Sequence, residues 1–121
     1  MNKILKFISL VVLIVSFQLN SFSKENFFNE AIKLYEKEKY EDARFLFERN
    51  IVFNPKDANS YLYLAKIYNH EEDQRKEEYN LETTLIIDPQ NEEAILMLMK
   101  IALEKKNSSI ISLTNLQEPI N

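Results

Sequence analysis

Apolar residues follow a helical spacing through most of this chain of 121 residues. In five successive segments they recur three and four positions apart, as they do on one face of a helix. We expect helices over residues 26–38, 40–53, 58–70, 74–87 and 91–105. Short polar connections near Lys39 and near Glu72 should join the first four helices into two antiparallel pairs, which makes the fold class all-α.

Two prolines, Pro55 and Pro89, define a 34-residue interval, and each follows an Asn or Asp at the end of an apolar run. Proline cannot continue a helix and biases the residue before it out of the helical region, so each proline should mark a turn. Asp57 and Asn91 follow these turns and are the expected N-caps of the next helices.

Sliding the sequence by this 34-residue interval also aligns bulky and small positions. The matching positions are Phe27, Ala31, Ala43, Phe47 and Pro55 in a first unit, Tyr61, Leu64, Ala65, Tyr68, Leu81 and Pro89 in a second, and Ile95, Leu98, Met99 and Ala102 in a third. Small residues at Ala31 and Ala65 would let two helices approach closely. Glu77 stands where the first unit has Ala43, so close crossing of the second helix pair is open to question.

This pattern resembles the tetratricopeptide repeat, a 34-residue helix–turn–helix unit that stacks into a solenoid. The resemblance covers about residues 26 to 105 and implies a right-handed helical-hairpin solenoid of about two and a half tetratricopeptide repeats. The alternative is a plain antiparallel helical bundle in which the spacing is accidental. Both interpretations predict helices, and only the 34-residue register separates them.

The segment over residues 1–23 has the pattern of a secretory signal peptide. Lys3 and Lys6 form a basic start, residues 7–17 are almost wholly apolar, and small residues surround an expected cleavage site near Ser23. The alternative is an uncleaved anchor, but about 11 apolar residues fall short of the roughly 20 that cross a bilayer. We therefore expect a signal peptide over 1–23, a repeat domain over 24–106 and a tail over 107–121. The tail should begin with a break at residues 107–109 and either form a frayed helix or lie extended.

The amino-acid composition excludes several kinds of functional site. The chain has neither cysteine nor glycine, which excludes disulfides, thiol catalysis and glycine-rich phosphate-binding loops. Removing residues 1–23 would take away two lysines and no acidic residue, so the net charge would move from −4 to about −6. An acidic domain is a poor candidate for a nucleic-acid binder.

The sequence offers little material for catalysis. His70 is the only histidine and lies in the acidic run His70-Glu71-Glu72-Asp73. It could bind a metal with these carboxylates, but a lone histidine in a predicted turn is more often a solvated surface residue. No serine has an evident base partner. We expect no enzyme, no metal site, no cofactor and no small-molecule substrate.

In the tetratricopeptide fold, the first helix of each unit lines a concave surface that binds partners. The resemblance carries this role onto Phe28, Ile32, Tyr35, Leu62, Tyr63, Lys66, Asn69, Leu96, Lys100 and Leu103. Phe28, Leu62 and Leu96 could equally be core residues, since apolar residues at helical spacing more often pack than bind. The polar members and Tyr35 are expected to face solvent.

These observations predict a non-catalytic scaffold or adaptor that binds a peptide segment of a protein partner on its concave face. The expected location is the periplasm or another extracytoplasmic space of a bacterial cell envelope, with an envelope assembly complex as one candidate partner. The alternative is a self-associating structural subunit, because the last helix, around residues 95–99, is apolar nearly all round and needs a cover.

Overall fold

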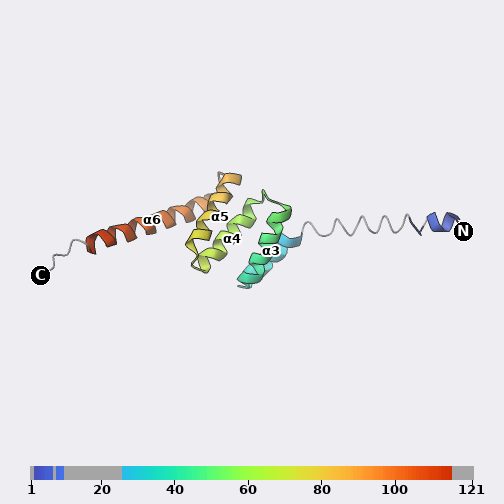
Figure 1. Cartoon of the computed structure of the whole chain (residues 1–121), viewed down its shortest axis with the longest axis horizontal. Coiled ribbons are helices and arrows are strands. Elements are labelled where there is room, and N and C mark those ends of the chain that lie inside the picture. The colour runs from blue at the N-terminus through green and yellow to red at the C-terminus, as the bar shows by residue number, and fades with distance from the viewer. Residues whose placement is uncertain (1, 7, 10–25, 116–121) are drawn as a thin grey trace. The chain divides into compact units, whose positions relative to one another are not determined.

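A computed structural model describes residues 2–6, 8–9 and 26–115 of the chain (Figure 1). These residues form helices and the turns between them, and no strand occurs among them, so the all-α expectation is confirmed for this part of the chain. Residues 2–6 and 8–9 are helical and exposed. The expected cleavage site near Ser23, most of the apolar segment before it and Pro119 lie outside the described residues.

The chain divides into two compact units, residues 1–55 and 56–121, and each is described by itself. The first unit is a hairpin of helix α2 (Asn26–Glu36) and helix α3 (Tyr40–Phe53). Its core consists of Ala31, Ala43 and Phe47, all fully buried. The ring of Phe28 packs edge-on against Phe47, with 5.7 Å between the ring centroids. Alanine at two positions of the hairpin lets the helices approach closely around this aromatic pair.

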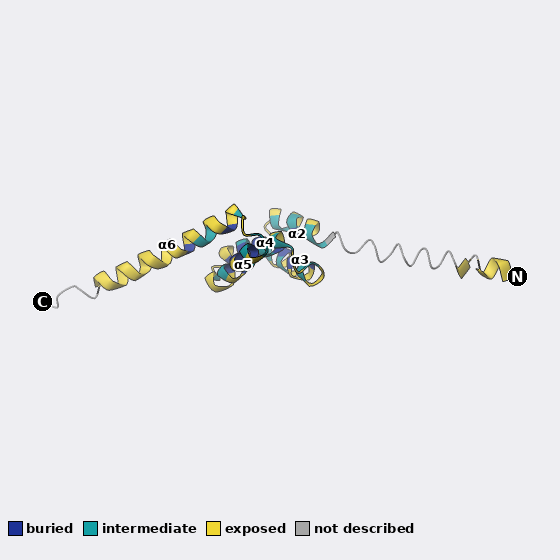
Figure 2. Cartoon of the chain, turned by 90° about the horizontal axis from the view of Figure 1, so that it is seen from above, coloured by how far each residue is buried: buried dark blue, intermediate teal, exposed yellow. Residues whose placement is uncertain are grey.

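The second unit contains helix α4 (Ala58–His70), helix α5 (Gln74–Ile87) and helix α6 (Glu92–Asn115). One core joins the three helices. It consists of Leu62, Ala65, Leu81, Ala94 and Ile101, with Leu85, Met97 and Leu98 packed against it. Figure 2 shows these buried positions in blue and teal and most of α6 in yellow.

The 34-residue period appears in the helix boundaries. Helix α5 begins and ends one such period after α3, and α6 begins one period after α4. Burial repeats as well, since the pairs Ala31 and Ala65, and Phe47 and Leu81, are fully buried at equivalent positions. The predicted boundaries of 40–53, 58–70 and 74–87 are confirmed, while α2 ends at Glu36, short of the predicted residue 38. The stacking of these hairpins into a right-handed solenoid stays a prediction.

The two hairpin turns have the same backbone geometry, one 34-residue period apart. Glu38 and Glu72 adopt the left-handed conformation, with φ of 58° and 59°. After α2, Lys39 N–H donates to the Leu34 carbonyl and Glu38 N–H to the Tyr35 carbonyl, at 2.9 Å each. After α4, the corresponding bonds run from Asp73 to Tyr68 (2.9 Å) and from Glu72 to Asn69 (3.1 Å). This pair of bonds is the Schellman motif, which usually places glycine at the left-handed position.

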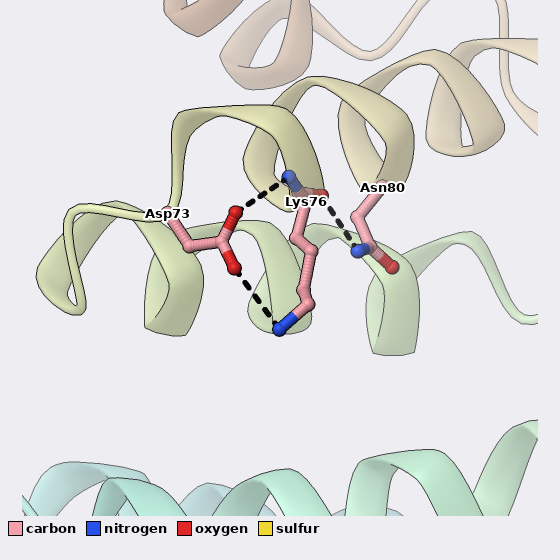
Figure 3. A network of polar contacts seen from close by, with 3 residues as sticks. All are labelled: Asp73, Lys76 and Asn80. Carbon is pink, nitrogen blue, oxygen red and sulfur yellow. Dashed lines mark hydrogen bonds and ion pairs between the residues drawn. The ribbon is translucent and has the colours of Figure 1, made fainter.

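The two turns differ in how they start the next helix. Lys39 precedes α3 with φ −85° and ψ 66°, and its side chain forms no capping hydrogen bond. Asp73 precedes α5 with nearly the same backbone angles, −89° and 75°, and accepts a hydrogen bond from the Lys76 N–H at 3.2 Å. Its other carboxylate oxygen lies 2.9 Å from Lys76 Nζ (Figure 3). Asn80 Nδ2 then donates to the Lys76 carbonyl at 2.8 Å.

The proline turns follow the expectation. The residues before Pro55 and Pro89 leave the helical region, with ψ of 71° and 87°. Asn91 caps α6, because its Oδ1 accepts the Ala94 N–H at 3.0 Å. Asp57 is the N-cap residue of α4, as predicted, but its side chain accepts no hydrogen bond from a backbone N–H of the helix. Its Oδ2 instead accepts the hydroxyl of the buried Ser60 at 2.6 Å.

Helix α6 is longer than predicted. The expected break at residues 107–109 is wrong, because the helix continues without interruption to Asn115. The hydroxyls of Ser108 and Ser109 donate to the carbonyls of Glu104 and Lys105, one helical turn earlier, at 2.9 Å each. Serine can satisfy its hydroxyl on the preceding helical turn in this way, so a polar run need not end a helix.

Candidate functional site

The candidate surface in the second unit is built around Tyr63 and Lys66 of α4. Lys66 Nζ lies 4.6 Å from the centroid of the Tyr63 ring and forms an ion pair of 2.7 Å with Glu93 Oε1 of α6. The Lys66 side chain is only 20% exposed, so the cation is held in one place. The Lys66 cation thus contacts the half-buried Tyr63 ring and ties α4 to α6 through Glu93.

Asn69, one turn further along α4, is exposed and makes a partly buried polar contact. Its Nδ2 donates to Glu77 Oε1 of α5 at 3.0 Å. Glu77 is buried at the position where the first unit has Ala43, and the hydrogen bond from Asn69 compensates in part for this burial. Burial raises the pKa of Glu77, while the hydrogen bond from Asn69 and the charge of Lys100 oppose that rise. The second helix pair therefore accommodates a buried carboxyl group at the position where the first pair has an alanine.

The predicted site residues of α6 lie on its exposed side. Leu96 and Leu103 are exposed by more than half, and Lys100 Nζ lies 4.0 Å from Glu104 Oε1. Leu96 is therefore not a core residue. Two large apolar side chains and a loosely paired cation remain available on this side of the helix, which is the composition of a contact surface.

Leu62 was predicted as a site residue, but it is buried in the structure. It is 5% exposed and belongs to the core that joins α4, α5 and α6. Its burial follows from its position one turn before the buried Ala65, on the side of α4 that faces α5 and α6. Leu62 contributes to stability and cannot contact a partner.

The remaining predicted residues, Phe28, Ile32 and Tyr35, lie on α2 of the first unit and are half-buried. The Phe28 ring packs on Phe47, and the Tyr35 ring contacts Tyr40 at a centroid distance of 5.4 Å. Within this hairpin, Phe28 is mainly a packing residue, as the alternative interpretation held. Ile32 and Tyr35 are partly accessible.

Over residues 2–6, 8–9 and 26–115, no group of three or more His, Cys, Asp or Glu side chains could hold a metal ion. His70 ends α4 at an exposed position. In the same ranges, no helix is both long enough and apolar enough to span a bilayer.

Sequence reasoning missed two polar partners, Glu93 for Lys66 and Glu77 for Asn69. Both pairs join residues on different helices, and helix packing alone sets which side chains meet. One signal for the second pair was present, because a glutamate in an otherwise small, buried position needs a hydrogen-bond donor nearby.

No protein-family description matches the chain, and no characterised protein matches it at a significant level. The resemblance to the tetratricopeptide repeat therefore rests on the chain's own 34-residue pattern and on the repeated helix boundaries and turns.

Proposed function

We propose that the chain is a non-catalytic adaptor of the tetratricopeptide type, exported to the bacterial cell envelope, that binds a peptide segment of a protein partner. The observation that carries this proposal is the repetition, at a 34-residue interval, of one hairpin turn with the same left-handed residue and the same two backbone hydrogen bonds. Hairpins of this length that repeat in register are the units of solenoids, and solenoids mostly bind proteins.

The peptide contacts are assigned to the side of α4 that carries Tyr63 and Lys66, together with Leu96, Lys100 and Leu103 of α6. The Tyr63 ring offers contact area at a low cost in side-chain entropy, and Lys66 holds that ring in place from its pair with Glu93. The two leucines provide apolar area, and Lys100 can orient an acidic or carbonyl-rich segment. A surface this short gives a modest affinity, roughly micromolar.

The test is site-specific crosslinking in the native envelope. A photoreactive phenylalanine analogue at Tyr63 should crosslink to a defined protein, and the same analogue at Tyr79 should not. Tyr79 is the matched control because it is an exposed tyrosine on α5, outside the proposed surface. Absence of a Tyr63-specific product would contradict the proposal.

The partner found in this way should then depend on the surface. Replacing Tyr63 and Lys66 together with alanine should weaken its capture by about tenfold or more, whereas Tyr79→Ala with Arg75→Ala should not. Circular dichroism must show that helicity is retained in both double variants. If capture survives in the Tyr63 and Lys66 variant, the peptide surface lies elsewhere on the chain.

A further inference from the structure

Helix α6 carries a second apolar stripe, on the side opposite the core. Its stripe residues are Leu96, Met99, Leu103, Lys106, Ile110 and Leu113, which we call the α6 stripe. Its five apolar members are between 49% and 65% exposed. The steps between successive members alternate between three and four positions, the spacing of the a and d positions of a coiled coil.

The opposite side of α6 is already occupied. Ala94 and Ile101 are buried against the core, and Met97 and Leu98 are partly buried there. Further along this side, Lys105 forms an ion pair with Glu78 of α5. Beyond it, residues 106–115 are exposed throughout, and the red end of α6 extends past α5 in Figure 1. A free helical end with large apolar side chains is marginal in water, so this segment needs a partner.

We propose that the α6 stripe pairs with the same stripe of a second copy of this chain, in antiparallel orientation. The spacing is palindromic about the midpoint between Glu104 and Lys105. A two-fold axis at that point places Leu96 opposite Leu113 and Met99 opposite Ile110. It also places Leu103 opposite Lys106, so every stripe position meets another stripe position. A two-fold interface requires this kind of self-complementarity.

Charge selects the antiparallel arrangement over the parallel one. In a parallel pair each residue faces its own copy, so two Lys106 ammonium groups would meet in the middle of an apolar seam. In the antiparallel pair each Lys106 lies beside Leu103 of the other copy, from where its long side chain can reach solvent. A single polar residue in such a seam fixes register and orientation and lowers the affinity.

The area of contact is sufficient for a weak dimer. The stripe runs over about 26 Å of helix, from residue 96 to residue 113. Ten aliphatic side chains, five from each copy, remove on the order of 100 Å² each, or roughly 1,000 Å² in total. That total is near the lower limit for a specific interface, so the dimer should dissociate in the roughly micromolar range.

The inference does not rest on the proposed adaptor function, and the two can fail separately. Ile110 lies outside the proposed peptide surface, and Tyr63 and Lys66 lie outside the stripe. The two surfaces do share Leu96 and Leu103, so dimerisation would exclude the peptide from α6.

The first experiment measures oligomeric state by sedimentation from roughly 1 to 200 µM, a range that brackets a micromolar dissociation constant. The gene is expressed whole, and the protein is used with the N-terminus that the cell leaves, as identified by mass spectrometry. Ile110→Glu should raise the dimer dissociation constant by about tenfold or more. Ile111→Glu, which makes the same change about 100° away around the helix, should leave it within about twofold. Lys106→Leu should lower it.

A protein that stays monomeric over this range overturns the proposal. Equal effects of Ile110→Glu and Ile111→Glu also overturn it, because they would show that the stripe is not the contact. If the protein is monomeric but binds vesicles of phosphatidylethanolamine and phosphatidylglycerol, and loses that binding with Ile110→Glu, a lipid surface covers the stripe instead.

The second experiment tests the orientation of the two α6 helices by disulfide crosslinking. The chain has no native cysteine, so an introduced cysteine is the only thiol in each variant. Under mild oxidation, Leu96→Cys and Leu113→Cys proteins should each stay uncrosslinked alone, because the two positions lie at opposite ends of an antiparallel pair. A mixture of the two proteins should form a disulfide-linked dimer. If each variant instead crosslinks to itself, the helices are parallel and the proposed arrangement is wrong.

Discussion

The left-handed residue of each hairpin turn should be a site where glycine stabilises the protein. Glu38 has φ of 58°, in a region where the side-chain Cβ crowds the backbone. For a residue other than glycine, that conformation costs roughly 1–2 kcal/mol. Glycine adopts it freely but gives the unfolded chain roughly 0.5–1 kcal/mol of extra conformational entropy. The difference predicts that Glu38→Gly raises the free energy of unfolding by roughly 0.5–1 kcal/mol.

The matched control is Glu36→Gly, in the last turn of α2. It removes the same charge, but at a position with helical backbone angles, where glycine lowers stability by roughly 0.5–1 kcal/mol. The two variants should therefore move in opposite directions in urea unfolding followed by circular dichroism. In a domain of this size, a change of about 1 kcal/mol corresponds to roughly 4–8 °C in Tm.

The equivalent change in the second unit, Glu72→Gly, should have the same sign because the turn has the same hydrogen bonds. If Glu38→Gly lowers stability as much as Glu36→Gly does, the left-handed turn is not strained in solution and the reasoning is wrong. Such a result would also weaken the structural equivalence of the two hairpins.

Three further predictions concern Glu77 and Asp73 of the second unit and Lys39 of the first. Burial raises the pKa of Glu77 in the folded state. The contribution of Glu77 to the free energy of unfolding is therefore largest below about pH 4.5, and it is lost as pH rises through the raised pKa. Glu77→Gln should thus be more stable than the parent at pH 7 and show a flatter pH dependence of the urea midpoint, unlike the exposed control Glu82→Gln; equal slopes for parent and variant would refute this. The pKa of Asp73 is lowered, first by the side-chain hydrogen bond with Lys76, so its contribution is present above pH 3.8 and falls away as pH drops through the lowered value. Asp73→Ala should lower Tm because it removes the side-chain cap of α5. Lys39→Ser adds a cap at the equivalent turn and should raise Tm. If Tm is unchanged in both variants, these caps do not contribute to stability.

The helix boundaries that could be predicted from the sequence are those set by local chemistry. Pro55 and Pro89 each follow the end of a helix by two residues, and the boundaries predicted around them for α3, α4 and α5 are correct. The end of α6 could not be predicted in this way, because Ser108 and Ser109 favour a break by composition but bond back to the helix in the structure. Local signals are ambiguous when a side chain can satisfy its hydrogen bonds in either conformation.

The candidate surface was predictable to a lesser degree. Exposure of Leu96 and burial of Leu62 depend on which side of each helix meets its neighbours, and both residues have the same apolar character in the sequence. The 34-residue register predicts which helices carry the candidate surface, and this assignment stays a prediction. It could not separate the two sides of an apolar helix such as α6, because both sides have helical spacing.

Because Lys66 already pairs with Glu93, an anionic segment of the proposed partner would have to compete with Glu93 for Lys66. A carboxylate of the proposed partner can pair with Lys66 only by displacing the Glu93 carboxylate. Because Glu93 belongs to the same chain, its effective concentration at Lys66 lies in the millimolar range or above. Salt weakens the internal and the external pair alike, so binding through Lys66 should change little with ionic strength. Selectivity at this position would then favour segments rich in carbonyl groups, which can contact the Tyr63 ring and leave the internal ion pair in place.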